Sequence, residues 1–479
     1  MTRTVVRSVF VCLLILLAVV ACQKKAEPTA ETPPTTSQPP QASGPTPPDI
    51  CKTAKDNCGQ LSQCAMAPLD PKATTQIPER PCTLQGQFND TTQQLVDVYS
   101  WNIFLALNWP GNSASCDANQ AKSITAVQSG DGTYTVWQTF MPGESVFVNP
   151  GYQKPAAWCS GNGLTLGAKR TFGNIAKATA NAADLDDPRL LKVAEPGNNV
   201  LQAKGGVVTD QDGRWLRYER LMNKVEYDYI VPNRWNAPQL NAMYQKGEAI
   251  RIPSGAIEIK SAWKILNGDE IKYKKYFTTQ ATVCNTPDDR KTPCDDQPVT
   301  MGLVGLHIVH QVNDGGTMFW STFEHVDNDT VFFNSKSNAA VNTNFANQPY
   351  TELDASCKPL NMPTQIKRIT PVPSNPDINT YYQGLLAGSV FANYRVISTQ
   401  WTAGVGSTAA GAPQHVANIV LETYAQDVVE KKNGSTGCMA CHFYASTRIK
   451  NDQGVRQDAN HSFFFLEAKN ATMKPTVVN

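Results

Sequence analysis

Two cysteines and a histidine lie close together near the carboxyl end of the chain. Cys438, Cys441 and His442 have the spacing C-x-x-C-H within the stretch GCMACHFYAS, residues 437–446. Thiols three residues apart lie on one side of a helical turn, and the adjacent imidazole reaches the same space. In c-type haem attachment, two such thiols bond the vinyl groups of one porphyrin edge and the histidine binds the iron. The pattern predicts one covalent haem c, with Cys438 and Cys441 as thioether residues and His442 as proximal iron ligand.

Two other uses of paired cysteines fit this stretch less well. A thioredoxin-like dithiol needs a preceding strand and a long following helix. Here a helix-like stretch and the loop KKNGSTG come before the motif. A structural zinc site needs a second Cys or His pair at finger spacing, and the nearest downstream histidine is the lone His461. Covalent haem therefore remains the favoured interpretation.

The sixth ligand of the predicted iron decides what the haem does. The candidates downstream of the motif are Met473, in ATMKP, and His461, in NHSFFFLEA, whereas Met439 lies inside the attachment loop and is badly placed. A methionine raises the reduction potential and a second histidine lowers it. With neither residue bound, the iron keeps an open position for a substrate.

The remaining histidines suggest weaker sites. His307 and His310 are three apart in a strand-like run, so they point to opposite faces and do not share one metal. The stretch FEHVDN brings together Glu324, His325 and Asp327. A carboxylate-supported imidazole moves protons, so Glu324 and His325 are weak catalytic candidates. The alternative is a polar strand end with internal hydrogen bonds.

These residues need a large body to position them, and its pattern predicts a mixed α+β fold rich in strands. A helix is predicted over TTQQLVDVYSWNIFLALNWP, residues 91–110, with Leu95, Val98, Tyr99 and Asn102 along one side and a stop at Pro110. Its aromatic residues are predicted to lie in the core, because burying such rings contributes a few kcal/mol each.

Three further segments have clear periodicity. Residues 255–266 alternate as a half-buried strand whose charged residues face solvent, and two strand-like runs around NDGG, residues 313–316, predict a hairpin. PQHVANIVLETYAQDVVEKKNG, residues 413–434, has Val416, Ile419 and Val420 at helical spacing, directly before the motif. We therefore expect a large α+β domain over residues 50–400, with a helical haem-attachment segment over 401–479 packed on it.

The N-terminus indicates export. Arg3 and Arg7 precede an apolar run of thirteen residues from Val9 to Ala21, too short for a bilayer, which needs about 20. The run therefore predicts a signal peptide over residues 1–21. The residues VVAC resemble a lipobox and imply a lipid on Cys22, with an ordinary secretory signal as the alternative. The residue after Cys22 is Gln23 and not the Asp that usually retains such lipoproteins at the inner membrane, so an outer-membrane location is favoured. The Pro-rich residues 22–49 predict an extended tether.

Charge and cysteine content agree with an exported protein. Without the two signal arginines the chain has 40 basic and 41 acidic residues, so a concentrated basic face for nucleic acid is not expected. Of thirteen cysteines, nine remain beyond the signal, the anchor and the motif. The pairs predicted are Cys284 with Cys294 and Cys116 with Cys159. The others are an N-terminal cluster of Cys51, Cys58, Cys64 and Cys82, and a spare Cys357.

The stretches SWNIFLALNWP, GAIEIKSAWK, GLHIVHQV, WSTFEHVDN and CMACH together resemble bacterial envelope lipoproteins of the monohaem c-type cytochrome kind, which join a large domain to one C-terminal motif. The resemblance implies a haem protein of the cell envelope. We expect electron transfer with a redox partner protein or a small-molecule donor or acceptor. One alternative is a haem-dependent oxidoreductase acting on peroxide or a small organic substrate at an open distal site. Another is a sensor that uses haem structurally.

Overall fold

The computed structural model describes residues 74–78, 90–112, 114–147, 155, 157–159, 170–172, 208, 210, 214, 216–283, 298–312, 316, 318–329, 368, 370–401, 413, 415–423, 426 and 437–468. These residues all belong to one compact unit, Pro45–Asn479. The predicted signal peptide, Cys22 and the tether lie outside the described residues. So do Met473 and the cysteines at 51, 58, 64, 82, 284, 294 and 357.

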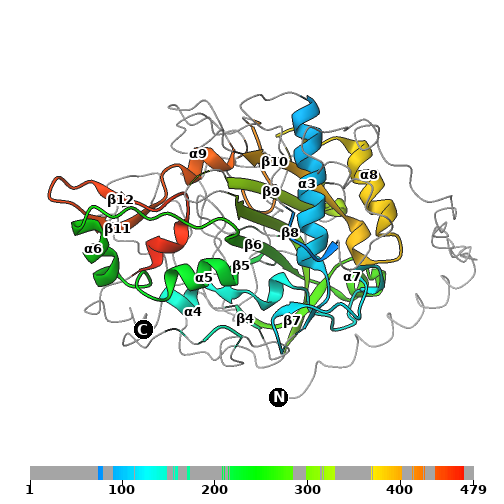
Figure 1. The fold of residues 1–479 in the computed structure, drawn as a ribbon. Helices are drawn as coiled ribbons and strands as arrows, with labels where there is room; N and C mark the ends of the chain where they lie inside the picture. Colours follow the sequence, from blue (N-terminus) through cyan, green and yellow to red (C-terminus); the bar gives the residue numbers. More distant parts are fainter. Residues whose placement is uncertain are drawn as a thin grey trace, which may run out of the picture. The chain divides into compact units, whose positions relative to one another are not determined.

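The described residues form a sheet of eight strands, with the order β10-β9-β8-β6-β5-β3 and with β7 and β4 joined at the start of β8 (Figure 1). β8 pairs with β6 along one side, and its other side pairs first with β7 and then with β9. The strands are β3 Met141–Pro142, β4 Arg170–Phe172, β5 Arg217–Met222, β6 Ile257–Ile265, β7 Thr278–Val283, β8 Val299–Gln311, β9 Met318–His325 and β10 Tyr394–Trp401.

The predicted strand and hairpin are confirmed. β6 covers the expected alternating run, and β8 and β9 are antiparallel on either side of residues 313–316. The expectation that the charged residues of β6 face solvent is wrong for Lys264, whose side chain is 2% exposed. It lies 2.5 Å from Glu270 and 3.2 Å from Asp210. Paired carboxylates are what allow an ammonium group to be buried.

One face of the sheet is covered by α3 (Asp90–Asn108), α8 (Pro376–Leu385) and the 3-10 helix η9 (Val390–Asn393) (Figure 1). The prediction of α3 is confirmed, but burial is not limited to one side: from Gln93 to Asn108 every side chain except that of Gln94 is buried. The reason is that α3 lies between two layers. Ser100 Oγ lies 2.7 Å from Ser321 Oγ on β9, while the Trp101 ring stacks on Tyr382 of α8 at 5.1 Å.

The opposite face carries the C-terminal residues together with α4, α5 and α6. They share one apolar cluster, which includes Met222, Val309 and Trp320 from the sheet and Met439, Phe464 and Phe465 from the chain end. The elements are α4 Gly143–Phe147, α5 Lys224–Ile230, α6 Ala237–Gln245, α9 Cys438–His442, β11 Ser446–Lys450, β12 Arg456–Asp458 and the 3-10 helix η11 Phe463–Glu467. α7, Gly268–Tyr273, follows β6.

The predicted helix over residues 413–434 is wrong for the part that the structure describes. Residues 415–423 form irregular and turn backbone and no α-helix, with a continuous buried run from Val416 to Leu421. Bonds to β9 replace the helical bonds: Asn418 Nδ2 donates to the backbone oxygen of Phe323 at 2.9 Å, and the Ile419 N–H donates to the Glu324 side chain at Oε1, 2.7 Å away. The segment after it is likewise a mixture of short helices and the β11–β12 hairpin rather than purely helical.

The whole is a strand-rich mixed α+β domain, as predicted. Within the described part of the chain, no helix combines the length and the apolar character needed to cross a membrane.

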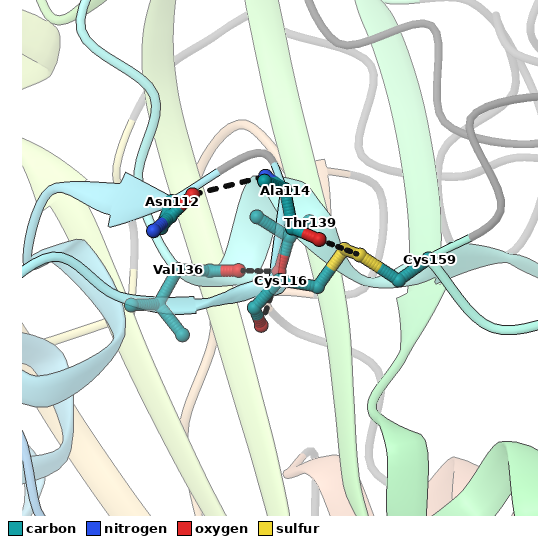
Figure 2. The surroundings of a disulfide bond; sticks show 6 residues. All are labelled: Asn112, Ala114, Cys116, Val136, Thr139 and Cys159. Atoms are coloured by element: carbon teal, nitrogen blue, oxygen red, sulfur yellow. Dashed lines mark hydrogen bonds between the residues drawn. A yellow bond between two sulfur atoms is a disulfide. The ribbon is translucent and has the colours of Figure 1, made fainter.

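The predicted disulfide between Cys116 and Cys159 is confirmed, and Figure 2 shows its surroundings. Cys116 belongs to the short turn that joins β1 (Gly111–Asn112) to β2 (Asp117–Ala118). The Cys116 N–H donates to Asn112 O at 2.8 Å, and Thr139 Oγ1 donates to the Cys116 carbonyl at 3.2 Å. The bond ties this turn to residue 159, 43 positions along the chain.

Candidate functional site

A row of polar residues crosses the sheet on the face that carries the C-terminal elements. Register places them side by side on successive strands, β5 to β9: Arg220, Lys260, His307 and Thr322. Apolar clusters lie on both sides of the row, one built around Trp320 and Met439 and the other around Tyr218 and Val420. A polar strip therefore separates two apolar clusters on this face.

Helix α9 carries the C-x-x-C-H motif next to this row. Gln400 of β10 holds its first turn: Gln400 Oε1 accepts from the Met439 N–H at 2.7 Å, and Gln400 Nε2 donates to Pro413 O at 2.6 Å. The N-cap residue Gly437 approaches so closely that a Cβ there would collide with the Gln400 amide. The side chain of Gln400 therefore replaces the missing cap, and any side chain at residue 437 would displace its amide group.

Cys438 and Cys441 are both thiols and half-buried. Burial and the nearby charge of Glu422 raise the pKa of the Cys438 thiol well above its usual value. Burial also lowers the pKa of Lys260, whose charge interacts with Glu422 and Cys441. The thiol of Cys438 is thus held in its neutral form.

The His442 imidazole is oriented by the backbone of His461. His442 Nδ1 lies 2.7 Å from the carbonyl oxygen of His461. A carbonyl only accepts, so Nδ1 carries the proton and Nε2 keeps its lone pair. Burial lowers the pKa of His442 to about 4, which keeps the ring neutral at physiological pH. His442 is therefore an oriented neutral imidazole whose Nε2 keeps a lone pair able to bind a metal or a proton.

The carbonyl of His461 is positioned by an unusual turn. Asn460 and His461 have φ angles of 50° and 68°, the left-handed region that residues other than glycine seldom occupy. Asn460 holds the turn by accepting from the Ile252 N–H at 2.7 Å and donating its own N–H to Asp458 at 2.7 Å. The His461 ring returns toward the backbone of His442, with Nδ1 3.4 Å from the His442 carbonyl.

Trp320 of β9 lies beneath both histidines. Its ring centre is 5.7 Å from that of His442 and 6.2 Å from that of His461. The side chain is 1% exposed, and its Nε1 has no hydrogen-bond partner among the described residues. A buried indole N–H normally has an acceptor, and the described residues supply none for this donor.

His307 and His310 lie on opposite faces of β8, as predicted. His307 Nε2 is 3.2 Å from Glu422 Oε2 on the side of the motif. His310 Nδ1 is bonded to the Tyr99 hydroxyl on α3. Burial alone would raise the pKa of Glu422, but His307 and Lys260 lower it by more. The net pKa is below its usual value, so Glu422 is anionic. His307 and His310 therefore cannot bind one metal together.

The weak catalytic candidates Glu324 and His325 lie away from the motif. They are adjacent in sequence, but their side chains have different partners. Glu324 pairs with Arg368 and accepts from the Ile419 N–H. His325 stacks on Tyr276 at 4.1 Å, and its Nε2 lies 3.2 Å from the carbonyl oxygen of Lys275. Both are fully buried and have partners that account for them structurally.

Comparisons with protein-family models, curated proteins and solved structures found no match. The assignment of the site therefore depends on its own geometry.

Sequence reasoning placed Cys438, Cys441 and His442 together but missed Trp320, Gln400, Lys260 and Glu422. The alternation of β6 puts Glu258 and Lys260 on one face, and this pattern could have identified Lys260 as a residue of that face. The register that aligns Lys260 with His307 comes from strands more than forty residues apart, and no single-sequence pattern encodes it.

Proposed function

We propose that this chain is a c-type cytochrome of the bacterial cell envelope that binds one haem covalently and transfers electrons. The observation that carries the proposal is the hydrogen bond from His442 Nδ1 to the carbonyl of His461. It fixes the tautomer and the direction of Nε2, which is the way proteins orient an imidazole ligand of a metal. The two thiols belong to the same helical turn as this imidazole.

The other uses of two cysteines have less support. A redox dithiol depends on a thiolate of lowered pKa, whereas burial raises the pKa of Cys438. α9 spans five residues and leads into strand β11, not into a long helix. Addition of two thiols to vinyl groups is the chemistry that this spacing suits best.

The residues around the motif fit a haem. The unsatisfied Trp320 N–H would donate to an acceptor on the group, and the apolar cluster around Met439 would exclude water. When bound, haem supplies an iron that accepts and releases one electron. The protein then contributes the oriented Nε2 of His442, whose basicity is strengthened by the His461 carbonyl, and a dry surrounding that sets the potential.

The geometry favours a supporting role for His461 rather than the role of sixth ligand. Its carbonyl binds the nitrogen of His442 that points away from Nε2, so its backbone lies behind the proximal imidazole. Met473 stays a candidate sixth ligand outside the described residues. We also propose that lipid on Cys22 anchors the protein at the outer membrane, and that its partner is a redox protein or a small electron donor or acceptor.

Absorption spectra of the purified protein in both oxidation states, with and without carbon monoxide, test this function. Electron transfer predicts covalent haem with low-spin, six-coordinate iron that does not bind carbon monoxide. High-spin iron that binds carbon monoxide would overturn it.

One observation favours a haem-dependent oxidoreductase as the second candidate. His307, Glu422 and Lys260 form a polar group close enough to the motif to interact electrostatically with Cys438, Cys441 and His442. A histidine held by a carboxylate is suited to move a proton to or from peroxide or a small organic substrate. The His307→Gln variant should then slow the spectral change caused by peroxide, whereas His310→Gln, on the opposite face, should not. Equal rates in the wild type and the His307 variant would remove this candidate.

A further inference from the structure

Two carboxyl groups, Glu226 fully buried and Glu258 half-buried, lie beside the candidate haem site. Glu226, in the first turn of α5, is fully buried, and its side chain faces that of Glu258 on β6, with which it is hydrogen-bonded. Neither oxygen of Glu226 accepts from an N–H or hydroxyl group among the described residues. Two facing carboxylates in a dry setting cannot both be charged, so the pair must hold a proton between them.

The charges around the pair do not remove the need for this proton. Arg220 of β5 forms an ion pair with Glu467 of η11. The charge of Arg220 lowers the pKa of Glu258 and that of Glu467 raises it. Lys260 is two residues along β6 and interacts mainly with Glu422. Burial raises the pKa of Glu226 well above its usual value and that of Glu258 to about 7. The proton of the pair is therefore exchangeable near neutral pH.

A short chain of contacts joins this pair to the proximal histidine. The Ser462 hydroxyl is hydrogen-bonded to Glu258. Ser462 directly follows His461, whose carbonyl accepts from His442 Nδ1. Through the sheet, Glu258 and Trp320 lie on one cross-strand rung with Val309 between them, about 10 Å apart at the usual strand spacing. The carboxyl pair is therefore within electrostatic range of an iron bound by His442.

We propose that the Glu226–Glu258 pair is a redox-linked proton site: when the haem iron gains an electron, the pair takes up a proton. This inference rests on the proposed haem function. An external one-electron donor reduces ferric to ferrous iron, and a solvent proton adds to a carboxylate oxygen of the pair. Reoxidation releases both. Glu258 is half-buried and gives the proton access from solvent, while Glu226 is sealed inside.

Coulomb's law gives the expected size of the effect. One added electron on the order of 15 Å away, at an effective dielectric constant of about 20, changes the proton affinity of the pair roughly five- to tenfold. The reduced protein binds the proton more tightly, so the reduction potential falls as pH rises through the titration of the pair. A tenfold difference corresponds to a total fall of about 59 mV for one electron.

Spectroelectrochemical titration of the holoprotein between pH 5 and pH 9 tests the proposal. We expect the wild type to show this fall and the Glu226→Gln/Glu258→Gln double variant to lose it. The control is Asp97→Asn. Asp97 is another buried carboxyl with a pKa raised to about 7, but it lies on α3, on the other face of the sheet. The control variant should keep the wild-type fall.

The wild type alone is sufficient to reject the idea if the variants fold poorly. Reduction in weakly buffered solution with an indicator dye should show proton uptake near pH 7. A haem protein whose potential is constant with pH, or a double variant that keeps the fall, overturns the proton site and leaves the cytochrome proposal standing. Protein without haem overturns both, and its missing absorption shows this before any titration.

Discussion

Nδ1 of His442 and the backbone oxygen of His461 are 2.7 Å apart, nineteen residues apart in sequence. The contact links α9 to the turn between β12 and η11, and it orients the imidazole of the motif. Because a backbone atom makes the contact, residue 461 needs the right φ angle more than it needs an imidazole.

Two substitutions of His461 should therefore differ. His461→Gly accepts a φ of 68° without strain and should keep the haem content and spin state of the wild type. His461→Val also lacks the ring, but a β-branched residue disfavours this angle and should weaken the turn by about 1–3 kcal/mol. Haem content and absorption spectra provide the measurement. A shift of the glycine variant to high-spin iron would instead identify His461 as an iron ligand.

Gly437 and Gln400 should be coupled energetically. Gly437→Ala places a methyl group against an amide held by Pro413 O and the Met439 N–H, so we expect a loss of about 1–3 kcal/mol and poorer haem attachment. Gln400→Ala removes the obstacle but leaves those two groups unsatisfied.

The double variant should lose less stability than the sum of the losses in the two single variants. Urea unfolding of the four proteins measures this. Gly268→Ala, where a Cβ meets no atom within 4 Å, is the control and should change stability little. Strict additivity between positions 437 and 400 would show that the close approach is unimportant.

Asp97 should make stability depend on pH. Burial raises its pKa to about 7, so the folded chain keeps a proton that the unfolded chain loses above about pH 4. Unfolding then releases a proton, and the free energy of unfolding falls by a few kcal/mol as pH rises from about 4 to about 7.

The Asp97→Asn variant removes this contribution and should flatten the stability curve over that window relative to the wild type. Urea unfolding at pH 4.5, 6 and 7.5 provides the measurement, with the exposed Asp269→Asn as control. Parallel curves for wild type and Asp97→Asn would contradict the assignment.

The bond between Cys116 and Cys159 should stabilise the domain. It closes a loop across 43 positions, for which chain entropy gives about 2–4 kcal/mol. The Cys116→Ser/Cys159→Ser variant should unfold at a correspondingly lower guanidinium concentration. A linked peptide pair in an unreduced digest would confirm the pairing directly, and an unchanged unfolding midpoint would contradict the expected stabilisation.

Local sequence patterns correctly predicted those elements that depend on residues close in sequence. The alternation of β6, the turn between β8 and β9, and the stop of α3 before Pro110 all depend on nearby residues, and each is confirmed. The spacing of Cys438, Cys441 and His442 is equally local, and α9 places them on one turn as expected.

Long-range contacts explain the failures. Val416, Ile419 and Val420 have helical spacing, but the segment is buried continuously. Asn418 donates to the backbone of β9, and the Ile419 N–H donates to Glu324 of β9. Lys264 is charged and was expected at the surface, yet it is buried. It pairs there with Asp210, which is distant in sequence, and with Glu270, which follows the strand. Such contacts depend on the assembled sheet.

Intact-mass analysis of the protein matured in an export-competent host tests the central claim most directly. The account predicts a chain heavier by one haem, and a Cys438→Ser/Cys441→Ser variant that lacks this added mass. A wild-type chain with both thiols unmodified and no haem attached would contradict it.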